Sequence, residues 1–212
     1  YETKKREIEQ AEHATDEEKQ VALNQLANNE KRALQNIDQA IANNDVKRVE
    51  TNGIATLKGV QPHIVIKPEA QQAIKASAEN QVESIKDTPH ATVDELDEAN
   101  QLISDTLKQA QQEIENTNQD AAVTDVRNQT IKAIEQIKPK VRRKRAALDS
   151  IEENNKNQLD AIRNTLDTTQ DERDVAIDTL NKIVNTIKND IAQNKTNAEV
   201  DRTETDLSLI HI

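Results

Sequence analysis

The sequence predicts an all-α fold in which tandem three-helix bundles with a 77-residue period form an elongated array. The period comes from three similar acidic strings, which open at Thr15, Thr92 and Thr169 and therefore lie 77 residues apart. The composition favours helices, since Gly occurs only 2 times and Pro only 4 times in 212 residues. Apolar residues recur at three- and four-residue spacing, as on one face of an amphipathic helix. Together these observations indicate a repeat architecture.

Composition limits both the core and the function. The chain has no Phe, Trp, Met or Cys and a single Tyr, so any core must consist of Ile, Leu, Val and Ala. The absence of cysteine excludes disulfides and thiolate chemistry and fits a protein outside a reducing cytosol. The net charge of -11 argues against a nucleic-acid or anionic-membrane partner. No run approaches the roughly 18 apolar residues of a membrane span. Because residue 1 is Tyr and no signal peptide is present, we interpret the chain as an internal piece of a longer protein.

The first helix of a complete period is expected from about Pro68 to Asp87. Proline suits the first helical position because its missing N–H would have no partner there. The string "DTPHAT" at 87–92 then breaks the helix. The apolar face of this first helix consists of Ala70, Ala73, Ile74, Ala78, Val82 and Ile85.

The second helix is expected after Thr92 and up to about Asn118, which at 1.5 Å per residue makes it about 40 Å long. The third follows a short polar break at 118–121 and ends before Pro139. The two apolar stripes are Ala99, Ile103, Leu107, Ala110 and Ile114, and then Val123, Val126, Ile131, Ile134 and Ile137. Three amphipathic helices with short connections predict an antiparallel bundle. The first helix could pack with its own second and third helices or bridge from the previous module.

The period divides the chain into three repeats. Residues 1–61 form a partial first repeat with the end of its first helix, 62–138 a complete second repeat, and 139–206 a third repeat truncated in its third helix. The apolar stripe is lost in 207–212, which we interpret as a tail foreign to the repeat. The linkers at 61–69 and 138–146 differ, because "IVI" in the first aligns with "VRR" in the second.

The acidic strings are interpreted as helix starts. In every copy a Thr and a Glu stand three residues apart, as a capping box requires: Thr15 with Glu18, Thr92 with Glu95, and Thr169 with Glu172. A metal or acid–base site is the alternative, since His13 and His90 precede two of these strings. The third copy has Asp167 there, so such a ligand set would not repeat. With no nucleophile turn or phosphate loop either, we expect no metal, no cofactor and no enzyme.

The basic run of Arg142, Arg143, Lys144 and Arg145 is the sharpest local anomaly. It is interpreted as a solvated charge cluster at a helix entry, with contact to a polyanion as the alternative. The aligned residues 65–68 are not basic, and no aromatic side chains interleave with the run for stacking. Positive charge at a helix start opposes the helix dipole, so helix electrostatics do not account for the run.

Three strings carry a family resemblance: "ATDEEKQVAL" at 14–23, "NNDVKRVETNGIATLKGVQP" at 43–62 and "IVIKPEAQQAI" at 64–74. On a 77-residue period they resemble the tandem helical repeats of staphylococcal cell-wall-anchored surface proteins, a domain of unknown function. The resemblance covers residues 1 to about 206. It implies a secreted protein whose repeat stalk separates an N-terminal functional region from a peptidoglycan anchor. It also implies roles in adhesion, aggregation and biofilm, and for some members in methicillin resistance.

Two functions fit these observations. One is a stalk that spaces a distal adhesion region from the cell wall. The other is a repeated binding module that recognises a host or wall ligand with avidity. Exposed positions differ between copies, since Lys47 and Arg48 align with Thr124 and Asp125, whereas core and cap positions repeat. We therefore favour the stalk. The expected partners are neighbouring repeats, with host matrix or cell-wall polymers as further candidates.

Overall fold

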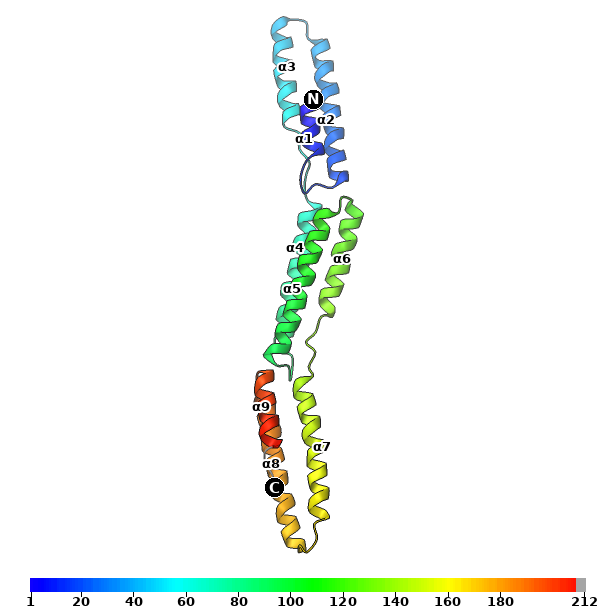
Figure 1. Cartoon of the computed structure of the whole chain (residues 1–212). Coiled ribbons are helices and arrows are strands. Elements are labelled where there is room, and N and C mark those ends of the chain that lie inside the picture. The colour runs from blue at the N-terminus through cyan, green and yellow to red at the C-terminus, as the bar shows by residue number, and fades with distance from the viewer. Residues whose placement is uncertain (209–212) are drawn as a thin grey trace. The chain divides into compact units, whose positions relative to one another are not determined.

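The computed structural model describes residues 1–208 of the chain, and all regular secondary structure in that range is helical. The helices are α1 (Glu2–Glu9), α2 (Asp16–Gln39), α3 (Asn43–Lys58), α4 (Ile66–Ile85), α5 (Val93–Asn116), α6 (Asp120–Gln136), α7 (Arg143–Arg163), α8 (Gln170–Gln193) and α9 (Asn197–Ser208). They follow one another as three sets of three (Figure 1). The predicted all-α tandem array is confirmed. The predicted tail falls partly outside this range, since 209–212 are not described.

The chain divides into two compact units. Unit 1 comprises Tyr1–Asn80 and Ser104–Gln136, and unit 2 comprises Gln81–Ile103 and the chain from Ile137 onward. The division passes through α4 and α5, so each unit contains one complete connection between successive sets of helices. No helix within the described residues is both long and apolar enough to cross a membrane.

The helices of the complete period lie close to their expected bounds. The expected ranges of 68–87, 93–118 and 122–138 compare with 66–85, 93–116 and 120–136 in the structure. The helix α4 starts two residues before Pro68, which nevertheless remains in the first turn. A missing N–H is harmless there, because the first four N–H groups of a helix have no partner within it.

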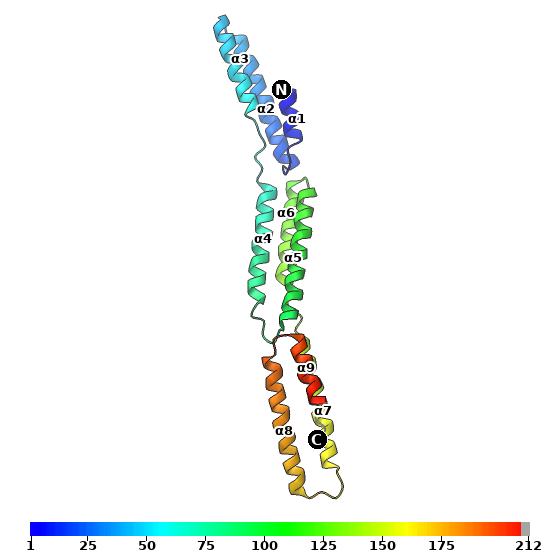
Figure 2. The same cartoon turned by 60° about the vertical axis from the view of Figure 1, so that its left-hand side comes forward.

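Unit 1 contains two apolar clusters. The first joins Ile8 of α1, Ala22 and Leu26 of α2, and Val60, which follows α3, with Leu57 of α3 packed against them. The second joins α4, α5 and α6 through Ala70, Ile74, Ala110, Ile114 and Val123. Figure 2 shows α4, α5 and α6 alongside one another. In both clusters the first helix of a period packs against its own second and third helices, which decides between the two arrangements left open by the sequence.

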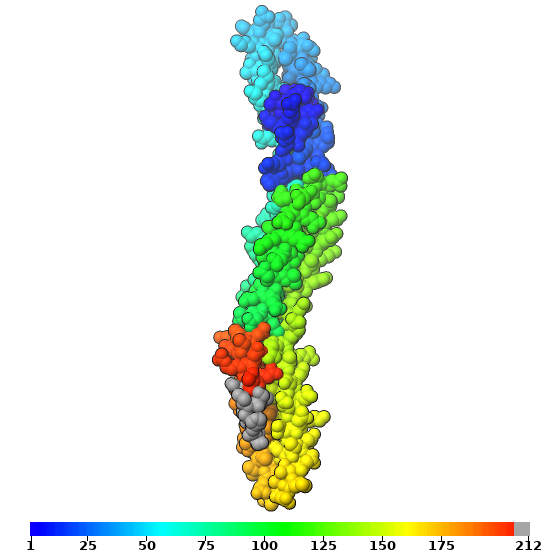
Figure 3. Space-filling view, viewed as in Figure 1, coloured from blue at the N-terminus to red at the C-terminus, as the bar shows by residue number. Residues whose placement is uncertain are grey.

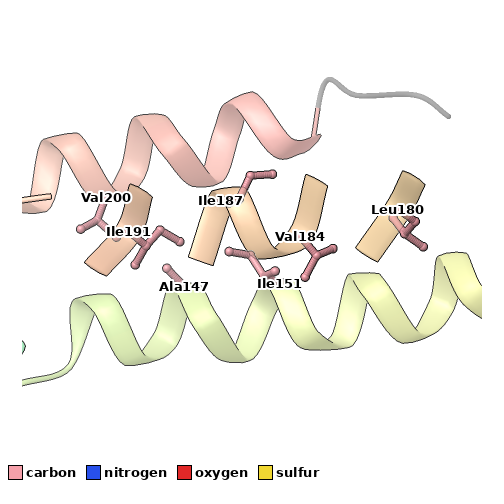
Figure 4. Packing of buried hydrophobic residues seen from close by; sticks show 7 residues of the cluster. All are labelled: Ala147, Ile151, Leu180, Val184, Ile187, Ile191 and Val200. Atoms are coloured by element: carbon pink, nitrogen blue, oxygen red, sulfur yellow. The ribbon is translucent and has the colours of Figure 1, made fainter. Parts of the chain in front are cut away.

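Unit 2 contains the corresponding cluster of the third period (Figure 4). Its buried side chains are Ala147 and Ile151 from α7, Leu180, Val184, Ile187 and Ile191 from α8, and Val200 from α9. The helix α9 packs against both α7 and α8, and its side chains lie on that pair in the space-filling view (Figure 3). The same three-and-four spacing that predicts the stripes therefore builds the third core.

One small residue sets a close approach in the first period. A Cβ added to Gly53 of α3 would lie 2.8 Å from the Cβ of Ala33 on α2. That distance is shorter than a van der Waals contact, so the two backbones can approach this closely only because position 53 lacks a side chain. The next period has Thr130 in place of Gly53, and its threonine is buried.

The narrow core predicts a sharp contrast between two valines of unit 1. Val123 is 0% exposed, whereas Val21 is 67% exposed on α2. The change Val123→Ala should lower the free energy of unfolding by about 2 kcal/mol, because it removes buried methyl groups and leaves a cavity. The matched change Val21→Ala should have little effect. Urea denaturation followed by circular dichroism measures both, and equal losses would contradict the assigned core.

Candidate functional site

The three helix starts share one turn. In each, the threonine hydroxyl accepts from the backbone N–H of the glutamate three residues on, at 3.2 Å for Thr15, 3.3 Å for Thr92 and 3.3 Å for Thr169. The glutamate carboxylate accepts in return from the threonine N–H, at 2.9, 3.0 and 2.8 Å respectively. These are the two reciprocal bonds of a capping box.

The residues that suggested a histidine site are placed by backbone conformation. His13, His90 and Asp167 have φ of 62°, 64° and 58°, and they are the non-glycine residues with positive φ in the described chain. Histidine and aspartate both tolerate this left-handed region better than most residues. What the three copies share is therefore a turn geometry. Among the described residues, no group of three His, Asp or Glu side chains could hold a metal ion.

The carboxylate of Glu18 has a second set of partners. Its other oxygen, Oε1, accepts from the backbone N–H of Val65 at 2.7 Å and of Ile66 at 3.0 Å. These N–H groups open α4, where they have no partner within the helix. The side chain is buried, at 9% exposure. One carboxylate thus caps two helices, α2 and α4, and α4 starts 48 residues after Glu18 in the chain.

Two further bonds complete this first junction, which we define as residues 15–18, 65–67 and 115–120. The N–H of Asp16 donates to the carbonyl of Asn118 at 2.7 Å. The N–H of Asp120, at the start of α6, donates to the carboxylate of Glu17 at 3.2 Å. The string that starts α2 therefore also caps α4 and α6 of the following period.

The second junction, residues 92–95, 142–144 and 192–197, lies in unit 2 and repeats the first at an offset of 77. The Oε1 of Glu95 accepts from the N–H of Arg142 at 2.7 Å and of Arg143 at 2.9 Å, at the start of α7. Like Glu18, Glu95 is buried. The carboxylate therefore repeats its contacts although "VI" has become "RR".

The remaining main-chain contacts also recur. The N–H of Val93 donates to the carbonyl of Lys195 at 2.8 Å, as Asp16 does in the first junction. The N–H of Asn197 donates to the carboxylate of Asp94 at 2.6 Å and so caps α9. The contacts that recur in both junctions join a backbone N–H to a backbone carbonyl or to a carboxylate of the acidic string, whereas the bond from the Thr92 hydroxyl to the side-chain oxygen of Asn197, at 2.8 Å, belongs to the second junction.

One linker side chain also repeats. Lys67 and Lys144 are 3% and 7% exposed, and their ammonium groups donate to the carbonyls of Glu115 at 2.6 Å and Ala192 at 3.0 Å. These carbonyls lie in the last turns of α5 and α8. A cation is favourable there because the carboxyl end of a helix carries partial negative charge.

The basic run is therefore largely engaged within the chain. Lys144 is buried instead of solvated, and Arg143 pairs with Asp201 and Glu204 on α9. The Glu95 carboxylate at the start of α7 supplies the negative charge that sequence alone did not provide there. Contact with a polyanion stays a prediction, and it rests on the exposed side chains of Arg142 and Arg145.

Burial and hydrogen bonding act in opposite directions on the junction carboxylates. Burial alone would raise the pKa of Glu18, but the N–H groups of Ile66, Thr15 and Val65, with the Thr15 hydroxyl, lower the pKa below its ordinary value. The pKa of Glu95 is lowered in the same way against its burial, by Arg142, Arg143 and Thr92. Both glutamates are thus held in the charged form that accepts the hydrogen bonds.

One side-chain contact of the first junction is absent from the second. In the first, the carboxylate of Glu115 lies 2.8 Å from Nδ1 of His13 and also accepts from the amide of Gln71. Burial raises the pKa of Glu115, but the bonds to His13 and Gln71 outweigh it and lower the pKa. The aligned residue of the second junction is Ala192, so this contact does not repeat.

Within the described residues, the third acidic string forms its own cap and has no bond to a following linker. Thr169 and Glu172 bond to each other as above but are exposed, whereas Thr15 and Thr92 are fully buried. A fourth capping box was missed in the sequence: Thr196 and Glu199 start α9, with bonds of 3.0 and 3.2 Å. The Thr-x-x-Glu spacing in "TNAE" could have predicted this box. The starts of α3 and α6, which align with α9, do not have this spacing.

Comparison with known proteins gives three consecutive matches to one family, described as Domain of Unknown Function (DUF1542), over residues 1–65, 66–142 and 143–208. The second and third matches begin at the first residues of α4 and α7, four residues after the expected boundaries at 62 and 139.

Among curated proteins, the chain is 26% identical to the extracellular matrix-binding protein ebh of Staphylococcus aureus strain MW2, over 97% of the chain and 2% of that protein. It is 21% identical to the extracellular matrix-binding protein EbhA of strain Newman, over 95% of the chain and 6% of that protein. The chain thus spans a small fraction of these relatives. No solved structure matches it.

The junction geometry predicts unequal effects for the same substitution at two caps. Glu18→Gln keeps the size of the side chain, but its single carbonyl oxygen replaces only one of the two acceptors, so the N–H of Thr15 or those of Val65 and Ile66 must face an amide NH2. We expect a loss of about 1–3 kcal/mol in the free energy of unfolding, since buried donors lose a charged acceptor. The matched change Glu172→Gln should cost clearly less, because that cap is exposed and serves one helix. Chemical denaturation of both variants tests this, and a larger loss at Glu172 would contradict it.

The lowered pKa values also predict a pH dependence. A carboxylate whose pKa is lower in the folded than in the unfolded state stabilises the fold above its unfolded pKa, about 4.3 for Glu, and loses that effect as pH falls through its folded pKa. The thermal midpoint should therefore fall on acidification through and below this range. The double change of Glu18 and Glu95 to Gln should flatten the dependence. Calorimetry over this range measures the difference, and parallel profiles would exclude the two carboxylates as its source.

Proposed function

The chain belongs to the DUF1542 repeat family, and from this we propose that it is a non-enzymatic repeat region of a bacterial cell-surface protein that spaces or presents a distal adhesion region away from the cell wall. Three consecutive family matches support the repeat character. The extracellular matrix-binding relatives support a cell-surface or extracellular location. The chain's described residues supply helix caps and narrow apolar cores, and neither feature provides a catalytic group.

The recurrence of the junction bonds is the observation that carries this proposal. Glu18 and Glu95 each accept from the two N–H groups that open the first helix of the following period. Glu17 and Asp94 each cap its third helix. A spacer needs every repeat to hold its successor in the same way, and we infer that the neighbouring repeats of the chain are each other's partners.

A repeated binding module is the second candidate, favoured by the relatives, which are described as extracellular matrix-binding proteins. Host matrix or cell-wall polymers are its candidate ligands. Against it stands the variation of exposed residues at equivalent positions, such as Asp125 in place of Arg48. Arg142 and Arg145 occur at one junction only, which offers a single polyanion contact and no avidity.

We also propose the finer placement that the sequence strings suggest, near the methicillin-resistance-associated surface protein FmtB, also called Mrp, or SasC-like proteins. The strings at 14–23, 43–62 and 64–74 support it. Peptidoglycan anchoring, roles in aggregation and biofilm, and a link to methicillin resistance come with this placement as proposals. The repeat boundaries at 62 and 139 and the foreign tail at 207–212 likewise remain proposals.

Small-angle X-ray scattering of this chain and of in-register extensions by one and two periods tests the spacer. The maximum dimension should increase by a constant step, up to about 40 Å per added period when its helices lie along the array, because each helix residue adds 1.5 Å. A dimension that grows only as the cube root of mass would show a globular particle and refute the spacer.

Binding of serum and cell-wall fractions separates the two candidates. For a spacer, the chain should capture no component saturably. Capture that grows with the number of repeats and survives the changes Arg142→Gln and Arg145→Gln would favour the binding module. Capture abolished by those two changes would identify the basic run as a polyanion contact.

A further inference from the structure

The third acidic string offers the same groups as the first two without their partners. In the first two copies, the glutamate Oε1 is occupied by two backbone N–H groups from a linker. In the third, Oε2 of Glu172 carries the cap to Thr169, and no linker N–H within the described residues reaches Oε1. Residues 169–172 are all exposed.

The other contact positions of this string are open as well. Gln170 aligns with Asp16 and Val93, whose N–H groups donate to carbonyls at 2.7 and 2.8 Å. Within the part of the chain that the structure describes, no such carbonyl faces the N–H of Gln170. Asp171 aligns with Glu17 and Asp94, each of which caps a third helix. Glu172, Gln170 and Asp171 therefore all lack, within the described residues, the partners that the aligned residues have in the first two copies.

We propose that residues 169–172 are the docking site for the helix-opening linker of a further DUF1542 repeat placed next in line. This rests on the repeat-array function proposed above and adds to it the partner and its mode of recognition. The aligned residues bind such a linker at both other copies in the same molecule, which indicates that a linker also binds here.

The recognised features of the occupant are mostly main-chain atoms. The linker of the next repeat must present two consecutive N–H groups at a helix start, and the loop before the third helix of that repeat must present a carbonyl and an N–H. Val65 and Ile66 meet this requirement as well as Arg142 and Arg143 do. Both linkers carry a lysine at the same position, Lys67 in the first and Lys144 in the second. Each lysine donates to a carbonyl of its own repeat and not to the acidic string. The site therefore accepts repeats of differing linker sequence.

Two in-register extensions test this docking. Residue 207 aligns with 130 and with 53, so the chain through Asp206 is continued either with residues 130–208 or with residues 53–138. The first extension presents the linker "KPKVRRK" to Glu172 and the second presents "QPHIVIK". Residue-resolved amide exchange by NMR then follows the N–H of Gln170 in the present chain and in both extensions.

We expect exchange at Gln170 to slow by roughly tenfold or more in both extended chains, because the N–H gains a carbonyl partner. The N–H groups of Asp16 and Val93 serve as internal controls, slow in all three chains. Glu172→Gln should then lower the thermal midpoint of the extended chains by as much as Glu95→Gln does, and by less in the present chain.

A Gln170 N–H that exchanges as fast in both extensions as in the present chain overturns the proposal. So does slowing in one extension only, since recognition would then depend on linker side chains. Protection in the unextended chain that rises with protein concentration would assign the site to a second copy instead. Failure of the spacer function is distinct, because scattering reports the maximum dimension and amide exchange reports the local contact.

Discussion

A buried carboxylate that closes two helix ends at once is the constraint on which the rest of the structure depends. Glu18 and Glu95 complete their own capping boxes and accept the first N–H groups of α4 and α7. Helix starts leave N–H groups that must find partners. Because the partner here belongs to the preceding period, the start of each new first helix is tied to the second helix before it. The Ala-rich cores are narrow, so these polar contacts matter more than they would in a broad hydrophobic core.

The parts of the fold that could be predicted from sequence are those with local causes. The period, the apolar stripes and the Thr-x-x-Glu strings all act within a few turns, and the helices lie within about two residues of their expected bounds. No such local signal predicted that Glu18 also caps α4. The capping box uses one oxygen of its carboxylate, and Ile66, which donates to the other oxygen, lies 48 residues further along the chain. Alignment of the linkers showed "VI" replaced by "RR", which hid a contact made by backbone atoms.

The same limit applies to the residues that looked functional. His13 and His90 suggested a metal or acid–base site because they are histidines. The property that they share with Asp167 is a positive φ, which a sequence shows only indirectly. Lys144 looked like one of four solvated cations, yet it is buried on the end of α8. Its alignment with Lys67 was the available clue, because a buried lysine repeats while its neighbours change. Arg143 is accounted for by Asp201 and Glu204, which belong to a different helix of its own repeat.

Recognition through main-chain atoms has a consequence for how such genes change. A crossover between misaligned copies of the repeat inserts or deletes a whole number of periods. Each junction of the resulting chain still has an acidic string opposite a pair of backbone N–H groups. No compensating substitution is needed at the new boundary, whichever linker it inherits. We therefore expect the number of repeats to change without loss of folding, because the donors that open each new first helix are backbone N–H groups.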